Sequence, residues 1–245
     1  MAKMVKKTIS YGVLSDPEQD AGGFVFFGAG NTAAGWHSKQ AYAEPLPLEI
    51  ALAKIFGCPV PQTQLEATAG LKVHYRTGED AAPANANGDK YNVDGGYQQD
   101  GVHNASGTNM NRASWNVDFS LYDRDGDFSG AYLWVDIDPT AKKDFLKFKY
   151  DDDNNVFVAK DKDGNTHVLE TGTGNGGKPG EVLQDSINIM FFKDLIDNDG
   201  NAKNGFQAWD MEHGQFDFVV GQFDNGVVET SVTVNVGAML IPDMI

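Results

Sequence analysis

The chain has 245 residues, a formal net charge of −16, 28 glycines and a single cysteine. The negative charge argues against nucleic acid and anionic membranes as partners, because their phosphates would be repelled. One cysteine excludes an internal disulfide, and no apolar run reaches the 18 residues that a membrane-spanning helix needs.

Residues 1–60 are expected to form an arm, a strand and one short element that pack on the main domain. Residues 6–14 (KKTISYGVL) predict an arm or edge strand, and residues 24–27 (FVFF) predict a buried strand. Residues 48–56 (LEIALAKIF) predict a helix that Gly57 ends, although a buried strand fits them equally well. We expect Cys58 to be a small buried hydrophobe.

The segment 114–139 predicts two strands joined by an acidic turn. Apolar and polar residues alternate in both halves, which is typical of strands with one buried face. We expect the two strands to pair as a hairpin that supplies one wall of the core. The expected buried positions are Trp115, Val117, Phe119 and Leu121 in the first half, and Ala131, Leu133, Val135 and Ile137 in the second.

Further strands are predicted at 71–76, 145–150 and 186–192, with a short segment at 208–211. Two hairpins are predicted from turn residues: 156–159 with 167–169, and 214–220 with 227–236 around an Asp-Asn-Gly turn. The polar stretch 77–112 is long for a loop, and Tyr91, Val93 and Tyr97 within it suggest a short hairpin flap.

About ten strands without a sustained helix indicate an all-β fold. We expect an antiparallel β-sandwich, jelly-roll-like, with long loops and at most one short helix. The sandwich domain is placed at 61–240, and residues 241–245 form a C-terminal tail.

Three pentapeptides, at 123–127, 161–165 and 197–201, share the pattern Asp-x-Asp-Gly-[Asp/Asn]. Alternating carboxylates on a loop are ligands that Ca²⁺ prefers, although the helix–loop–helix calcium pattern is not met. Two interpretations remain: hairpin turns with solvated acids, which we favour, and calcium sites. The predicted calcium ligands are Asp123, Asp125, Asp127, Asp161, Asp163, Asp197 and Asp199.

Signatures of catalysis are weak. Residues 172–179 (GTGNGGKP) contain G-x-G-x-x-G, but no helix follows, and Pro179 stands where a phosphate loop needs a hydroxyl. The five histidines are scattered, and no G-x-S-x-G is present. We therefore expect no enzyme, no catalytic residues and no cofactor other than calcium.

Aromatic side chains lie on the second face of the strands in 114–139. Tyr122, Tyr132 and Trp134 present rings with an apolar face and a polar edge, which suit a sugar platform or a protein contact. The alternative, which we favour, is that this face is covered by the second sheet or by the long loop.

Four strand segments resemble a loose group of uncharacterised bacterial secreted proteins that often carry a C-terminal sorting anchor. The segments are 70–76 (GLKVHYR), 114–120 (SWNVDFS), 135–140 (VDIDPT) and 232–237 (VTVNVG). The resemblance covers about 70–237 and implies a β-rich extracellular or surface module with no known activity. Neither a signal peptide nor an anchor after Gly237 is visible.

These features favour a non-enzymatic structural or interaction protein. We expect a β-sandwich component of an assembly such as a phage particle (a decoration or other virion protein) or a surface layer, located on a virion or cell surface. Its partners would be copies of itself or a larger particle. The alternative is a calcium-dependent carbohydrate-binding module with a glycan partner.

Overall fold

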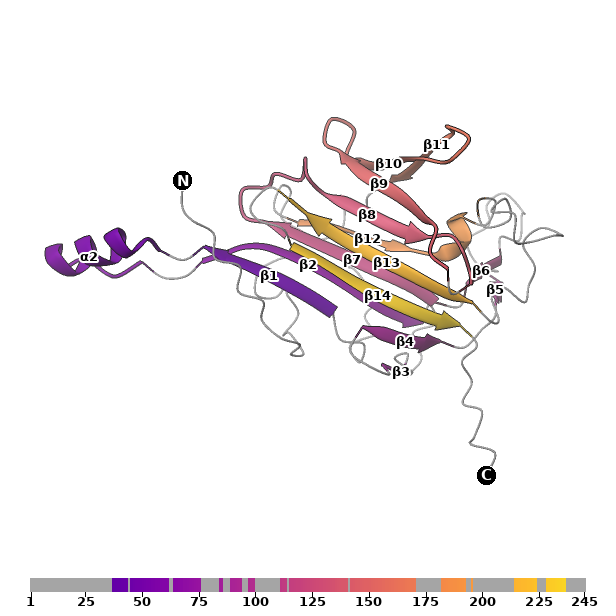
Figure 1. Ribbon diagram of the computed structural model, residues 1–245, viewed down its shortest axis with the longest axis horizontal. Helices are drawn as coiled ribbons and strands as arrows, with labels where there is room; N and C mark the ends of the chain where they lie inside the picture. Colours follow the sequence, from indigo (N-terminus) through magenta and orange to yellow (C-terminus); the bar gives the residue numbers. More distant parts are fainter. Residues whose placement is uncertain are drawn as a thin grey trace, which may run out of the picture.

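The computed structural model describes residues 37–43, 45–61, 64–75, 84–85, 89–93, 97–99, 111–113, 115–140, 142–170, 182–192, 195, 214–223 and 228–236. Two β-sheets lie face to face, and a long arm with a helix at its tip projects from one end (Figure 1). Among these residues no helix has the length and hydropathy needed to cross a membrane.

The smaller sheet has four antiparallel strands in the order β1-β2-β7-β12. The larger has eight in the order β11-β10-β9-β8-β13-β14-β4-β3, antiparallel except where β14 runs parallel to β4. The strands of the smaller sheet are β1 (His37–Ala43), β2 (Gln64–Tyr75), β7 (Trp115–Asp123) and β12 (Val182–Ile187). Those of the larger are β3 (Ala84–Asn85), β4 (Lys90–Val93), β8 (Tyr132–Asp136), β9 (Phe145–Asp151), β10 (Val156–Lys160), β11 (Thr166–Glu170), β13 (Gln215–Gln222) and β14 (Val228–Val236).

The core lies between the two sheets, where alternate residues of each strand meet. Phe119 of β7 packs edge-on against Phe157 of β10, with ring centroids 5.5 Å apart. Trp115 of β7 contacts Phe216 and Phe218 of β13 at 6.1 and 6.3 Å. These contacts join one sheet to the other, so the predicted all-β sandwich is confirmed.

The expected hairpin within 114–139 is wrong in its pairing, although its buried faces are right. β7 belongs to the smaller sheet and β8 to the larger, so the acidic turn between them carries the chain across the core. Alternation shows which side chains are buried but not which strand is the hydrogen-bonded neighbour, and two strands facing each other across a core give the same pattern as a hairpin.

Elsewhere the two predicted hairpins form: β10 pairs with β11, and β13 with β14. A short hairpin does form within 77–112, where β3 pairs antiparallel with β4, but it is not a flap, because Tyr91 and Val93 of β4 are buried core residues. The strand expected at 186–192 ends at Ile187 and is followed by a 3-10 helix, Ile189–Phe192. Two short strands, β5 (Tyr97–Gln99) and β6 (Asn111–Ala113), pair with each other. The predictions at 6–14, 24–27, 172–179, 208–211 and the turn 224–227 lie outside the described residues.

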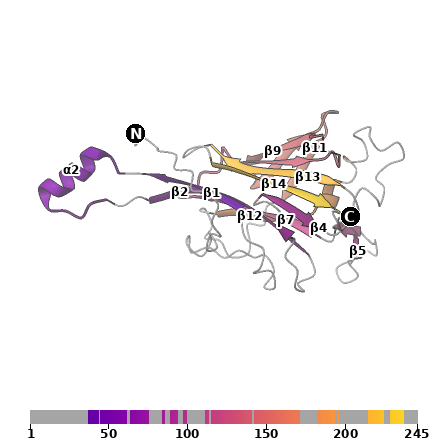
Figure 2. The same cartoon turned by 60° about the horizontal axis from the view of Figure 1, so that its bottom comes forward.

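The arm is a two-stranded ribbon of β1 and β2 that continues beyond the sandwich and carries α2 (Pro47–Phe56) at its tip (Figures 1 and 2). The helix interpretation of 48–56 is thus confirmed, and Gly57 ends the helix with a left-handed φ of 66°. The helix projects from the body instead of packing on it, and the predicted domain boundary at residue 60 falls inside the arm. Cys58 is exposed and not buried, because it follows the helix at this tip.

Candidate functional site

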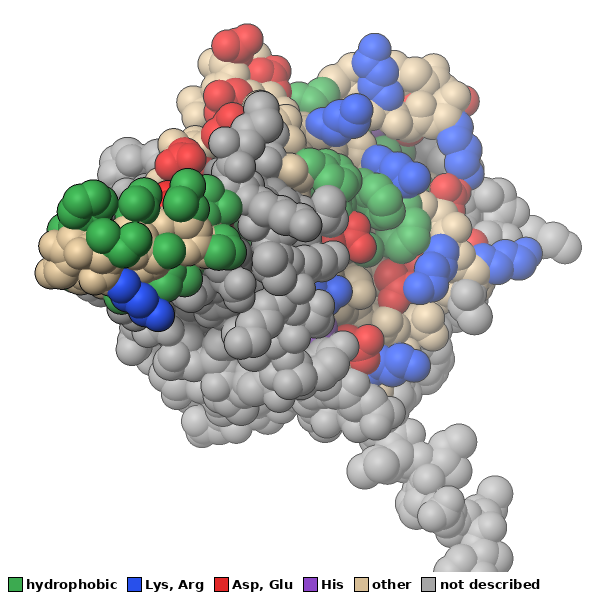
Figure 3. Space-filling model, turned by 60° about the vertical axis from the view of Figure 1, so that its left-hand side comes forward, with side chains coloured by type: hydrophobic (Ala, Val, Ile, Leu, Met, Phe, Trp, Pro, Cys, Tyr) green, Lys and Arg blue, Asp and Glu red, His purple; other side chains and the backbone are tan. Residues whose placement is uncertain are grey.

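The arm tip presents apolar side chains to solvent (Figure 3). Leu48 is 66% exposed, Leu52 42%, Ile55 73% and Phe56 72%, and of the ten helix residues Ala53 alone is buried. Single exposed apolar residues are ordinary, but a contiguous apolar patch marks an interaction site. The tip is therefore a candidate contact surface.

The spacing of these side chains puts them on one side of α2. Leu48, Leu52 and Ile55 stand at positions i, i+4 and i+7, which form one stripe of a helix, and Phe56 extends it. In most globular proteins such a stripe faces the core. Here the stripe has no core to face among the residues that the structure describes.

Two of the three Asp-x-Asp-Gly segments fold into the same hydrogen-bonded turn. Oδ1 of Asp123 accepts hydrogen bonds from the backbone N–H groups of Asp125 and Asp127, at 2.9 and 3.3 Å. The fourth residue, Gly126, has a left-handed φ of 72°, and its N–H donates to the Asp123 carbonyl at 3.2 Å. The pattern therefore specifies a turn: an acceptor first, a glycine fourth.

The second segment repeats this geometry. Oδ1 of Asp161 accepts from the N–H groups of Asp163 and Asn165, at 3.0 and 2.8 Å, and Gly164 has a φ of 85°. His167 Nε2 lies 2.8 Å from Asp161 Oδ2, and hydrogen bonds from His167 and Asn165 lower the pKa of Asp161 to about 2. The carboxylate is thus already satisfied by the protein.

These turns do not fit a calcium loop, because the first carboxylate of each faces its own backbone N–H groups and not a shared centre. Within the described ranges no group of three His, Cys, Asp or Glu is placed to hold a metal ion. Asp125, Asp127 and Asp163 are exposed. Asp197 and Asp199, the remaining predicted ligands, lie outside the described residues.

Four rings form a continuous row on the outer face of the larger sheet, which we call the aromatic row. Phe223 stacks on Tyr132 at 4.8 Å, Tyr132 contacts Trp134 at 5.3 Å, and Trp134 contacts Phe145 at 6.0 Å. The ammonium of Lys147 lies 4.5 Å from the centroid of the Trp134 ring. Trp134 is partly exposed and Phe223 is 55% exposed, so one edge of the row meets solvent.

Gly221 allows Tyr132 to lie flat across the sheet. A Cβ at this position would stand 2.6 Å from the Tyr132 hydroxyl oxygen and 2.7 Å from the Val228 carbonyl. Across the glycine the Tyr132 hydroxyl donates a hydrogen bond to Glu229, and burial together with this bond raises the pKa of Tyr132.

The predicted aromatic contact residues are brought together only in part. Tyr132 and Trp134 are neighbours, whereas Tyr122 lies in β7 of the other sheet. Phe145 and Phe223 were not expected in the row. Phe145 occupies one of the alternate positions of β9 whose side chains point outward, so the sequence could have placed it in the row once β8 and β9 were known to be neighbours. Phe223 follows the end of β13, where alternation no longer predicts the direction of a side chain.

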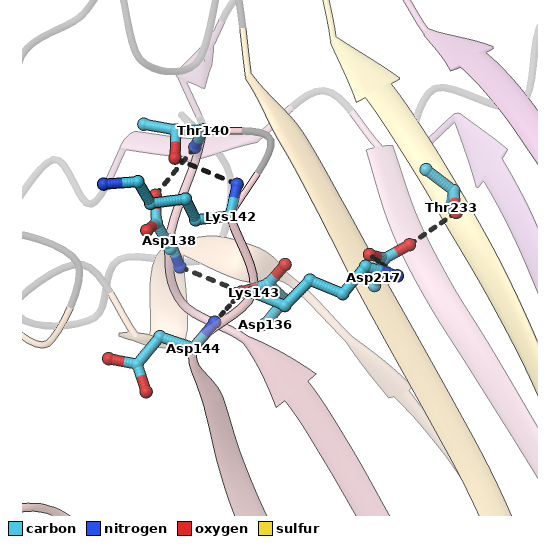
Figure 4. A network of polar contacts seen from close by, with 8 residues as sticks. All are labelled: Asp136, Asp138, Thr140, Lys142, Lys143, Asp144, Asp217 and Thr233. Carbon is cyan, nitrogen blue, oxygen red and sulfur yellow. Dashed lines mark hydrogen bonds and ion pairs between the residues drawn. The ribbon is translucent and has the colours of Figure 1, made fainter.

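The loop between β8 and β9 is held by a run of side-chain turns (Figure 4). Asp136, Asp138 and Thr140 each accept a hydrogen bond from the backbone N–H two residues further on, at 3.1, 2.9 and 3.2 Å. Oδ1 of Asp136 also accepts from the N–H of Asp144 at 2.9 Å, which closes the loop. The side chains of Asp136, Asp138 and Thr140 therefore fix the backbone conformation of the loop between β8 and β9.

Two carboxylates are buried beneath the loop. Asp217 forms an ion pair with Lys143, with Nζ 2.7 Å from Oδ2, and accepts a hydrogen bond from the Thr233 hydroxyl (Figure 4). Asp136 is fully buried, and its Oδ2 accepts no hydrogen bond. Burial raises the pKa of Asp136 to about 7, with contributions from Asp217 and Asp138 against the lowering effect of the two backbone N–H groups.

A scan against protein-family models found no match, and searches of curated proteins and of solved structures found no similar protein. The resemblance to bacterial secreted proteins therefore stays a prediction.

We predict that Asp123→Ala destabilises the protein while Asp125→Ala does not. The first substitution leaves the N–H groups of residues 125 and 127 without their buried acceptor, and the expected loss is about 1–3 kcal/mol of unfolding free energy. The second removes an exposed carboxylate and should change stability by less than about 0.5 kcal/mol. Urea denaturation measures both. A rise in melting temperature with CaCl₂ that Asp125→Ala abolishes would contradict the turn interpretation.

A second prediction concerns pH. A carboxyl with a pKa raised to about 7 in the fold contributes stability that is present below pH 4 and is lost as the pH rises through 7. Asp136→Asn mimics the protonated form, so between pH 5 and 8 the wild type should lose on the order of 2 kcal/mol relative to this variant. Denaturation curves at each pH give the difference, with Asp152→Asn as the control for net charge. A constant difference across the range would show that the raised pKa is wrong.

Proposed function

We propose that the protein is a non-enzymatic structural protein, a β-sandwich subunit that assembles with copies of itself through the arm. The observation that carries the proposal is the apolar stripe of α2, held away from the body on a two-stranded ribbon. A phage particle or a surface layer is the kind of assembly we propose, and a virion or cell surface is the corresponding location.

The helix is too short to be stable by itself. Isolated helices of fewer than ~12–15 residues are marginal in water, and α2 has ten residues. Its ends are well made: Glu49 accepts the Leu46 N–H at 2.9 Å, Pro47 begins the helix, and Gly57 ends it. Caps of this kind contribute only ~1 kcal/mol each. Packing of the exposed stripe against a partner would supply the additional stability that a helix of this length needs.

The ribbon that bears the helix is anchored to the sandwich by strand pairing and by an ion pair. β2 is twelve residues long and pairs with β7 along its inner part and with β1 from Leu71 to Gln64. Where the arm leaves the body, Arg124 is joined to Glu66 with Nη1 2.7 Å from Oε1. An arm fixed in this way presents the helix in a defined direction, which favours specific assembly over loose adhesion.

Carbohydrate binding is the second candidate, and the aromatic row is the observation that favours it. Rings on the outer face of a sheet offer an apolar platform to a sugar. Two features weaken it: Lys147 already lies over Trp134, and the Asp-x-Asp-Gly turns are satisfied without calcium.

We predict that Leu48→Gln, Ile55→Gln and Phe56→Gln together abolish self-association. Glutamine keeps the helix propensity but removes the apolar stripe. Light scattering at increasing concentration should show growing mass for the wild type and monomer mass for the triple variant. In dilute solution, where the wild type is monomeric, the two melting temperatures should be equal because these side chains are exposed.

The matched control is Phe223→Gln, which removes an exposed apolar side chain from the body. It should associate like the wild type. A wild type that stays monomeric up to its solubility limit counts against the proposal, as does unchanged association of the triple variant.

A further inference from the structure

The two sheets have unequal widths, and this leaves an opening on one side of the sandwich. The smaller sheet ends at β12, whereas the larger continues through β9 and β10 to β11. No strand of the smaller sheet among the described residues pairs beyond β12. Of the described strands, none therefore fully covers the inner face of the β10–β11 hairpin, and a groove remains between β11 and β12.

The groove has a volume of about 440 Å³ and an aromatic floor. Phe119, Phe148 and Phe157 line it from the core, and Phe192 lines it from the 3-10 helix. Phe191, 46% exposed, lies at its rim, whereas Val168 pairs with Val158 and faces the outer side of the sheet. Thr166, His167, Asp185 and Ser186 add polar groups to its lining. The groove is thus a hollow with an apolar floor and partly polar walls, large enough for a few side chains but not for a whole domain.

The arm and the groove are complementary in kind. The stripe of α2 offers four projecting apolar side chains, and the groove offers an aromatic floor. Apolar grooves receive an amphipathic helix through anchors at i, i+4 and i+7, which is the spacing of Leu48, Leu52 and Ile55. Lys54 lies in the last turn of α2 and Asp185 lines the groove, so the two surfaces carry charges of opposite sign.

A chain cannot dock its own arm in its own groove. The arm extends from the end of the sandwich where the β7–β8 turn lies, while the β10–β11 hairpin lies on the far side of the body (Figure 1). A contact between the arm helix of one copy and the groove of another is heterologous, because it uses two different surfaces of the same molecule. Such contacts continue from copy to copy until they close into a ring or form an open array.

We propose that the groove between β11 and β12 receives the arm helix of a second copy of this chain. This assignment rests on the proposed function, namely that the arm mediates self-assembly. The stripe exposes on the order of 400 Å² of apolar surface, against ~800 Å² per partner in stable interfaces. One arm contact alone is therefore weak, and each copy gains stability by giving one arm and receiving another.

Cysteine cross-linking tests the assignment, because Cys58 at the arm tip is exposed and is the sole cysteine of the chain. Wild-type protein, which carries Cys58 on its arm, is mixed with a Phe191→Cys, Cys58→Ser variant, which carries a cysteine only at the groove. The control partner is Ser231→Cys, Cys58→Ser, with its cysteine at an exposed position of β14 in the same sheet. A short bismaleimide is added, and the joined peptides are identified by mass spectrometry.

We expect the groove variant to give about tenfold more mixed covalent dimer than the control, joined between residues 58 and 191. In a second measurement, Phe191→Asp should weaken self-association about tenfold while Ser231→Asp leaves it unchanged, since only the first places a charge at the rim of the groove.

Equal cross-linking of both variants, or none, in samples where light scattering shows the wild type to be associated, overturns the groove assignment and leaves the proposed function standing. Absence of any association of the wild type overturns both.

Discussion

The exclusion of water between two sheets of unequal width is the constraint on which the structure depends. Rings from both sheets fill the space: Phe119 meets Phe157, and Trp115 meets Phe216 and Phe218. Four strands cannot cover the inner face of eight. The same packing that closes the middle of the sandwich therefore leaves an apolar groove beside β11, and the fold carries an opening that follows from its strand count.

The arm has the converse feature, an apolar helix surface that does not pack on the sandwich. The ribbon of β1 and β2 continues past the strands that flank it, and within the described part of the chain no sheet face covers the apolar residues of α2. A chain with a net charge of −16 does not need this apolar surface to fold. Exposed apolar surface lowers solubility, and a specific contact with another copy is the simplest function that would account for it. Uncovered helix and uncovered groove are, in this account, two halves of one interface.

Much of the fold is readable from local pattern, and the limits of that pattern are physical. Alternation correctly placed the apolar residues of β7 and β8 in the core, because successive side chains of a strand point to opposite faces whatever its neighbour. Pairing depends on the whole chain, so β7 and β8 were wrongly expected to form a hairpin. The turn at 161–165 was predicted because aspartate and glycine specify it locally.

The candidate sites were harder to predict. Leu48–Phe56 has the spacing of a core helix, and only the course of the ribbon shows that its stripe faces water. Cys58 was expected to be buried for the same reason. Tyr132 and Trp134 were predicted because they occupy alternate positions of one strand. The groove between β11 and β12 depends on the order of strands in both sheets, and no short segment of sequence specifies that order.

Hydrogen exchange of the amides of residues 47–56 tests the central claim most directly, because an uncovered ten-residue helix opens readily and a docked one does not. The account predicts that these amides exchange quickly in dilute protein and become protected in step with association as the concentration rises. Protection that is the same at every concentration, in samples that pass from monomer to assembly, would contradict it.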